Sequence, residues 1–171
     1  TTIVFDIPEF TDPLPKEYEL IQPFTDGAVA LYTGHFHATP VVASTDDTLA
    51  TLLTMQIVPQ AGTHAIVRGR VATGAVTVID STGEGTYVYL GTARPIETPY
   101  LTAIVDPGMP EWLRQMFERR LPELFAAYAK EFGVALPWKP VVLYSFHDTA
   151  STGYSSGGGT LTGLINMTLN G

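Results

Sequence analysis

The chain has 171 residues, 45% of them hydrophobic, and its 17 Asp and Glu outnumber its 9 Lys and Arg, which leaves a net charge of -8 at pH 7. This charge disfavours nucleic acid or an anionic membrane surface as a partner, because both require clustered cations. The lack of cysteine excludes a disulfide, a thiolate zinc site and a thiol nucleophile, and no apolar run reaches the roughly 18 residues that a membrane span requires.

Residues 1–99 consist of short β-rich runs separated by turn residues, which predicts an antiparallel β-sandwich domain. A proline-bearing stretch at residues 6–15 precedes the runs and is interpreted as an extended arm or edge segment, because proline cannot donate to a strand ladder. Glycines at 73–74 and 81–85 supply turns. The predicted strands span residues 28–32, 51–58, 64–71, 75–79 and 86–90.

Residues 100–171 have a different pattern and predict a second, partial domain. A strand at 100–105 leads through a turn at 106–110 into an amphipathic helix that ends near Gly133. Because Pro122 lies inside the helical pattern and lacks an amide donor, we expect a kink or two abutting helices there. The apolar residues whose three- and four-residue spacing predicts this helix are Trp112, Leu113, Met116, Phe117, Leu121, Leu124, Phe125, Tyr128 and Phe132.

The end of the sequence predicts a strand at 141–146, a polar loop at 147–156 and a terminal edge strand at 160–169. The whole chain is therefore expected to be an α+β protein, in which a β-sandwich precedes the order strand, long helix, strand, loop and edge strand. Three glycines at 157–159 stand before the terminal strand, and a flexible loop over 155–159 is an alternative interpretation of them.

The terminal run carries a family resemblance. It begins Gly157-Gly158-Gly159-Thr160-Leu161 and reaches Gly-Leu-Ile at 163–165. This run resembles the Gly-x-Met-Glu-Asn-x-Gly-Leu-Ile segment of the aminopeptidase N family of zinc metallopeptidases, a gluzincin family that includes glycyl aminopeptidase relatives. The order of elements over 100–171 is similar to the start of the thermolysin-like catalytic domain of that family, which a β-rich domain precedes. The resemblance thus implies the N-terminal part of a bacterial zinc metallopeptidase-like protein.

In that family the segment is the active-site edge strand, and its backbone pairs with the substrate peptide. The resemblance therefore implies that Gly157, Gly158, Gly159, Thr160 and Leu161 bind a peptide or protein substrate. The family's zinc-binding His-Glu-x-x-His helix follows a few dozen residues later and does not occur in this sequence. We therefore expect no catalytic residue, no metal ligand and no activity in these 171 residues alone, with zinc in the complete protein.

The sequence departs from the family segment at three positions. Gly159, Thr160 and Leu161 stand where the family has methionine, glutamate and asparagine. The family's glutamate holds the free amino group of a substrate, so its loss at Thr160 puts exopeptidase specificity in question. A degenerate peptidase fold kept for binding or assembly is therefore one alternative. Another is a non-catalytic β-rich module that binds peptide or glycan, with Tyr87, Tyr89 and Tyr100 either stacking on the ligand or packing in the core.

Other polar residues suggest chemistry less specifically. His35 and His37 would share one face of a strand and could bind a metal with His64 or an acid, although an exposed polar face is the simpler interpretation. His147 and Asp148 follow a predicted strand and could act as base and orienting group, or they could be a solvated loop pair. The serines of the same loop are Ser151, Ser155 and Ser156, and they lack the Gly-x-Ser-x-Gly pattern of a serine hydrolase.

The sequence starts at Thr1 rather than methionine, which favours a processed product or a fragment. A removed export signal would fit this start, and the corresponding expectation is a periplasmic or secreted location. An apolar terminal strand is an aggregation hazard when its edge is unpaired, so the protein's own C-terminal fragment is a further candidate partner.

Overall fold

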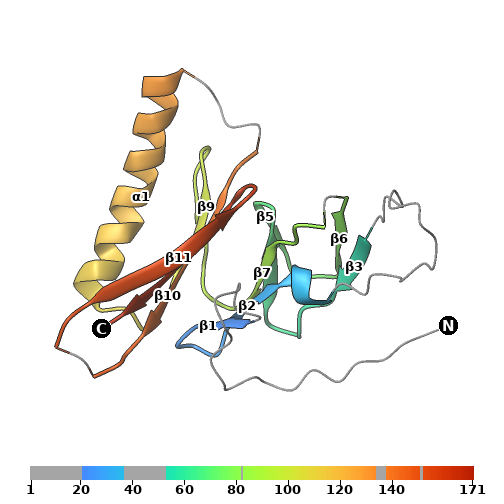
Figure 1. Ribbon diagram of the computed structural model, residues 1–171, viewed down its shortest axis with the longest axis horizontal. Coiled ribbons are helices and arrows are strands. Elements are labelled where there is room, and N and C mark those ends of the chain that lie inside the picture. The colour runs from blue at the N-terminus through green and yellow to red at the C-terminus, as the bar shows by residue number, and fades with distance from the viewer. Residues whose placement is uncertain (1–20, 37–52, 82, 134–137, 151) are drawn as a thin grey trace, which may run out of the picture.

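The computed structural model describes residues 21–36, 53–81, 83–133, 138–150 and 152–171, and within them the protein is an α+β fold of two five-stranded sheets, a two-stranded ribbon and one α-helix. These parts are stacked in order, with the helix α1 at one end and the ribbon β3–β6 at the other (Figure 1). The predicted arm at residues 6–15 lies outside the described residues.

The first sheet, sheet A, is antiparallel throughout and has the strand order β1-β2-β7-β4-β5. Its strands are β1 (Ile21–Pro23), β2 (Val29–Tyr32), β4 (His64–Val67), β5 (Arg70–Ala72) and β7 (Tyr87–Gly91), and the 3-10 helix η1 (Thr33–Phe36) follows β2. The predicted strand at 64–71 is wrong in one respect, because Arg68 and Gly69 both have positive φ and reverse the chain between β4 and β5. Arginine at a left-handed turn position is unusual, so this hairpin lacks the common asparagine-glycine signal.

The ribbon of β3 (Leu53–Ile57) and β6 (Val76–Asp80) packs against one face of sheet A. Alternation along the strands explains the contact, because every second side chain of β4 and β7 points to the ribbon. Ala65, Val67 and Val88 form a buried cluster there with Val78 of β6, and Met55 packs beside them. Two antiparallel β layers thus share a core, as expected of the β-rich first part of the chain.

The second sheet, sheet C, is mixed and has the strand order β11-β12-β10-β9-β8. The strands β9, β10 and β12 run parallel, whereas β11 and β8 are antiparallel to their neighbours. Strand bounds are β8 (Ile96–Glu97), β9 (Thr102–Val105), β10 (Val141–His147), β11 (Ser155–Leu161) and β12 (Leu164–Asn170). The predicted terminal strand at 160–169 is therefore wrong as a single element, because Gly163, with φ of 74°, turns the chain between β11 and β12.

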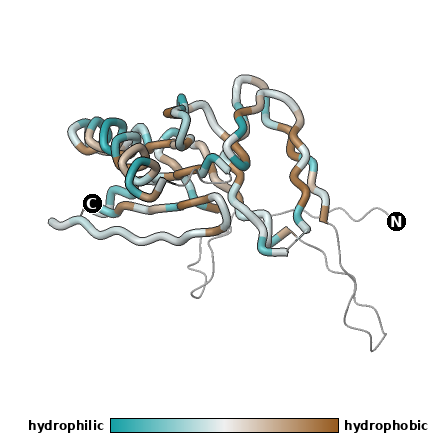
Figure 2. The backbone as a smooth tube through the Cα atoms, turned by 90° about the horizontal axis from the view of Figure 1, so that it is seen from above, coloured by the Kyte–Doolittle hydropathy of each residue, from teal (hydrophilic) through white to brown (hydrophobic). Residues whose placement is uncertain are grey.

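The helix α1 (Glu111–Phe132) covers the face of sheet C that points away from sheet A (Figure 1). Polar and apolar residues alternate around its turns, as an amphipathic helix requires (Figure 2). Pro122 lies in its interior, and the prediction of two abutting helices is wrong. Leu121 and Phe125 pack on sheet C on both sides of Pro122, which keeps the two halves in one helix. Gly133 ends the helix in the left-handed conformation, as predicted.

Sheets A and C are joined by the largest buried cluster. Ile66 and Tyr89 of sheet A pack there against Ile104, Leu143 and Leu164 of sheet C. Sheet C thus lies between α1 and sheet A. Strand β11 is at one edge of sheet C, next to β12. The predicted division into 1–99 and 100–171 stays a prediction, although this cluster draws residues from both sides of it.

The buried position of Tyr89 predicts a loss of stability at alkaline pH. Its ring is fully buried and its hydroxyl accepts a hydrogen bond from the Ala93 amide at 3.1 Å. Desolvation by burial raises the pKa of Tyr89 to about 12. In the unfolded chain the pKa is about 10, so between these values the unfolded state loses a proton that the folded state keeps. The free energy of unfolding should therefore fall by about 1 kcal/mol per pH unit as the pH rises through this window.

Chemical denaturation at several alkaline pH values measures this slope. Tyr89→Phe cannot ionise at this position, so the variant should lose less stability between about pH 10 and 12 than the parent protein. An identical slope in the two proteins would contradict the assignment to Tyr89.

Candidate functional site

Strand β11 forms one edge of sheet C and contains all five residues that the sequence predicts to bind substrate. Among the described strands it pairs with β12 alone, in a register that places Gly158 opposite Met167 and Thr160 opposite Ile165. Gly157 to Gly159 lie inside the strand, so the alternative of a flexible loop over 155–159 is wrong. The predicted polar loop accordingly ends before Ser155.

Ladder geometry determines which backbone groups of β11 face outward. The turn between β11 and β12 has two residues, and Leu161 and Leu164 close it as a directly opposed pair. In an antiparallel ladder such pairs alternate between bonded and non-bonded positions. The Gly159 amide donates to Asn166 of β12, so Gly159 and every second residue from it face β12. The N–H and C=O groups of the residues between them, Ser156, Gly158 and Thr160, therefore point away from β12. These alternating donors and acceptors are what an added peptide strand requires.

The two neighbouring glycines Gly157 and Gly158 differ in what surrounds them. A Cβ atom on Gly158 would stand 3.0 Å from Met167 Cα and still closer to the Asn166 carbonyl oxygen. A Cβ atom on Gly157 would meet nothing within 4 Å. Gly158 therefore permits the close approach of β11 to β12, whereas Gly157 leaves the surface of the strand bare.

Polar side chains hold the hairpin in place from the side of sheet A. The Asn166 side-chain oxygen accepts a hydrogen bond from the Gly159 amide at 3.1 Å. Behind it, the buried Gln22 amide of β1 donates to the Ser145 hydroxyl at 2.8 Å and to the Met167 carbonyl oxygen at 3.0 Å. This network ties β12, the neighbour of β11 in the sheet, to both β10 and sheet A.

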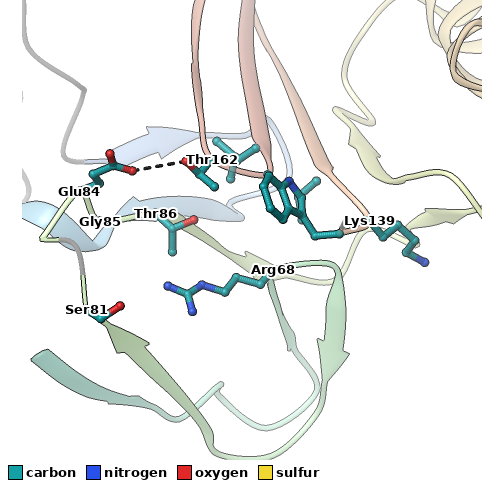
Figure 3. A pocket seen from close by; sticks show the side chains of 11 residues that line it. Arg68, Ser81, Glu84, Gly85, Thr86, Lys139 and Thr162 are labelled. Carbon is teal, nitrogen blue, oxygen red and sulfur yellow. Dashed lines mark hydrogen bonds between the residues drawn. The ribbon is translucent and has the colours of Figure 1, made fainter. Parts of the chain in front are cut away.

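Thr160, which the resemblance aligns with the family's glutamate, is exposed near the end of β11. Its hydroxyl carries no charge and cannot neutralise a substrate amino group as a carboxylate does. A carboxylate does lie near the same end of the strand, because the Thr162 hydroxyl donates to Glu84 at 3.4 Å. Glu84 belongs to the segment between β6 and β7 and comes from the other side of the sheet interface (Figure 3).

A hollow of about 330 Å³ opens beside this turn, between sheet A and the β11–β12 hairpin (Figure 3). Its walls include Arg68, Glu84, Thr86, Trp138 and Thr162. We call it the hairpin pocket. Sequence reasoning missed these residues, because they come from four distant segments. The Arg-Gly pair inside an apolar run at 64–71 was the one available signal, since glycine there indicates a turn.

His35 does not lie on the predicted strand. His35 belongs to η1 and its ring contacts Tyr32 edge-on at 5.1 Å, while His37 lies outside the described residues. His64 packs near Tyr89, with ring centres 5.8 Å apart. Within the described part of the chain, no group of three His, Asp or Glu side chains could hold a metal ion.

His147 and Asp148 lie at the C-terminal end of β10 and differ in burial and hydrogen bonding. His147 is the last residue of the strand, and its Nε2 atom is buried. Asp148 accepts a hydrogen bond from the Ala150 amide at 3.0 Å, which fixes the following turn. Of the three candidate serines, Ser155 and Ser156 are exposed residues of β11 and Ser151 lies outside the described residues.

The tyrosines of the alternative binding surface are separated by the fold. Tyr87 and Tyr89 are fully buried in the cluster between the sheets, so the core-packing interpretation is confirmed and a stacking platform on them is wrong. Tyr100 is 43% exposed and lies near the C-terminal end of α1.

Comparisons with protein-family models, curated proteins and solved structures gave no match for this chain. No helix in the described ranges has the length and apolar character needed to cross a membrane.

Proposed function

We propose that this chain is the front part of a zinc metallopeptidase-like protein and that β11 binds an extended peptide substrate by strand addition. The observation that carries the proposal is the position of the glycine-rich strand β11 at the edge of sheet C. An edge position supports the substrate role that the resemblance implies for this segment. Substrate residues would pair with the outward backbone groups of Ser156, Gly158 and Thr160.

Bare glycines suit a strand that receives peptides of varied sequence. Gly157 and Gly159 present no side chain, so the contact is made by backbone groups that every peptide offers. Zinc, when bound in such a protein, polarises the scissile carbonyl and activates water. In this proposal its ligands and the general base belong to a segment outside these 171 residues. The contribution of the present chain is to bind and orient the peptide.

A non-catalytic peptide-binding protein with a degenerate peptidase fold is the second candidate. The observation that favours it is the uncharged Thr160 at the position of the family's glutamate. The encoded continuation after Gly171 discriminates the two, because a His-Glu-x-x-His helix supports a peptidase and its absence supports a binding protein. Bacterial origin and a periplasmic or secreted location stay predictions under both.

Peptide titration of the 15N-labelled 171-residue chain tests the edge-strand proposal by NMR. The probe is a capped peptide of alternating threonine and valine, which favours an extended conformation. We expect the amide signals of Ser156, Gly158 and Thr160 to shift more than those of Gly157 and Gly159, which face β12. Equal shifts at the opposite edge strand β8, or unshifted β11 signals, would contradict the proposal.

Two variants at one position isolate the backbone contribution. Thr160→Pro removes an outward N–H without removing a ladder bond to β12, and should weaken peptide binding about tenfold or more. Thr160→Val keeps the N–H and should bind as the parent protein does. Circular dichroism of both variants verifies that the fold is intact.

A further inference from the structure

The hairpin pocket begins where the edge strand ends. Thr162, in the turn that follows β11, lines the pocket together with Arg68 of the β4–β5 turn and Thr86, directly before β7 (Figure 3). A peptide that pairs with β11 and extends beyond Thr160 therefore reaches the pocket opening. Its volume of about 330 Å³ lies at the lower end of the range for small-ligand sites, which suits one side chain or one chain terminus.

The backbone of Arg68 is held in a conformation that arginine disfavours. Its φ is 47°, and Gly69 beside it has φ of 74°, so the two residues form the turn between β4 and β5. Asparagine followed by glycine is the common choice for two such positions, because asparagine tolerates the left-handed region. Backbone strain of this kind is concentrated at functional positions, which makes the Arg68 side chain a candidate for ligand binding.

The turn is also fixed in position by its neighbours. A Cβ atom on Gly69 would stand 2.8 Å from the Lys139 carbonyl oxygen, so the turn lies directly against the segment that leads into β10. The Arg68 side chain extends across the pocket toward Ser81 and Thr86 (Figure 3). Glu84 occupies another wall, where Thr162 donates a hydrogen bond to it.

The guanidinium of Arg68 makes no ion pair with any residue that the structure describes. Arg68 is exposed and lines the pocket, so its guanidinium is accessible to a ligand there. Guanidinium presents a planar fork of donors that matches a carboxylate. The hydroxyl groups of Ser81 and Thr86 lie in the same pocket and can donate further hydrogen bonds.

We propose that the hairpin pocket binds a carboxylate of the peptide held by β11, with Arg68 as the residue that recognises it. The inference rests on the proposed function, because β11 must first hold the peptide. The carboxylate has two sources, an acidic side chain or the free C-terminus of the peptide. Either would make Arg68 a specificity-determining residue for acidic peptides.

Three peptides of one length test the assignment by NMR titration against the 171-residue chain. The first is neutral and capped at both ends, the second has one glutamate near an end, and the third has a free C-terminal carboxylate. We expect the second or the third to bind about tenfold more tightly than the first, since a charge-assisted hydrogen bond contributes about that factor. The one that gains identifies the source of the carboxylate.

Arg68→Asn should abolish the gain and leave binding of the neutral peptide unchanged. Because asparagine suits the turn, the variant should melt at the same or a higher temperature than the parent protein, so unfolding cannot explain the loss. Arg70→Asn is the charge-matched control, since Arg70 is exposed on β5 outside the pocket lining and should leave the gain intact.

The outcomes separate this inference from the proposed function. If the neutral peptide shifts β11 signals and no carboxylate increases affinity, the pocket assignment is wrong and the edge-strand proposal stands. If no peptide shifts β11 signals, both are wrong. A gain that survives in Arg68→Asn also overturns the assignment to Arg68.

Discussion

Replacing Asp106 with alanine should lower the free energy of unfolding by about 4 kcal/mol, because three backbone amides lose a buried acceptor. Asp106 is fully buried directly after β9. Its carboxylate accepts hydrogen bonds from the Phe146 amide at 2.9 Å, the Gly108 amide at 3.0 Å and the Thr25 amide at 3.2 Å, and from the Thr25 hydroxyl. One side chain thus connects the β1–β2 turn, the start of α1 and the strand β10.

Urea denaturation of Asp106→Ala and of two controls measures this effect. Asp106→Asn keeps one carbonyl oxygen but turns an amide group toward other donors, so it should lose about half as much stability. Asp148→Ala removes an exposed carboxylate with one bond to the Ala150 amide and should cost less than about 1 kcal/mol. If Asp106→Ala and Asp148→Ala were equally stable, Asp106 would not be the connection described.

The second large effect is expected at Gly158. Gly158→Ala should destabilise the protein by about 3 kcal/mol, because the new methyl group collides with backbone atoms of β12, which cannot rotate away as a side chain can. The collision involves the Asn166 carbonyl oxygen and Met167 Cα. Since the hairpin β11–β12 must separate to make room, peptide binding along β11 should be lost together with stability.

Gly157→Ala is the matched control for this prediction. The two glycines are adjacent in one strand, and a methyl group on Gly157 enters open space. Its free energy of unfolding should stay within about 0.5 kcal/mol of the parent value. Thermal melting and denaturant titration of both variants provide the comparison. Equal destabilisation at the two positions would show that loss of glycine flexibility, rather than the contact with β12, determines the result.

Strong local patterns made most of the fold predictable. Apolar periodicity predicted the helix over 111–132 and six strands. The observed bounds of these elements agree with the predicted ranges within a few residues, and the six strands are β2, β3, β6, β7, β9 and β10. Two hairpins were missed because their turns lack the usual signals: Arg68 occupies a left-handed position, and Thr162-Gly163 lies inside an apolar run. Packing of Leu121 and Phe125 overrode the break expected at Pro122.

The candidate site was predictable only where one segment builds it. The glycines of β11 are contiguous and carry the family resemblance, but the predicted strand began only at residue 160 and left them outside it. The pocket depends on Arg68, Glu84 and Thr162, which no local pattern links because sheet A and sheet C meet only after folding. Burial is likewise a tertiary property, and it decided between a core role and a surface role for Tyr87 and Tyr89.

The buried Gln22 network has a consequence for the order of folding during synthesis. Gln22 lies in the first described strand, and its amide bonds reach Ser145 and Met167, more than 120 positions later in the chain. The face of sheet A that receives sheet C therefore stays uncovered until β10 and β12 have left the ribosome. Non-local closure of this kind slows folding and leaves apolar surface open to aggregation. Chains that terminate before β12 should thus depend on chaperones far more than chains that include β12.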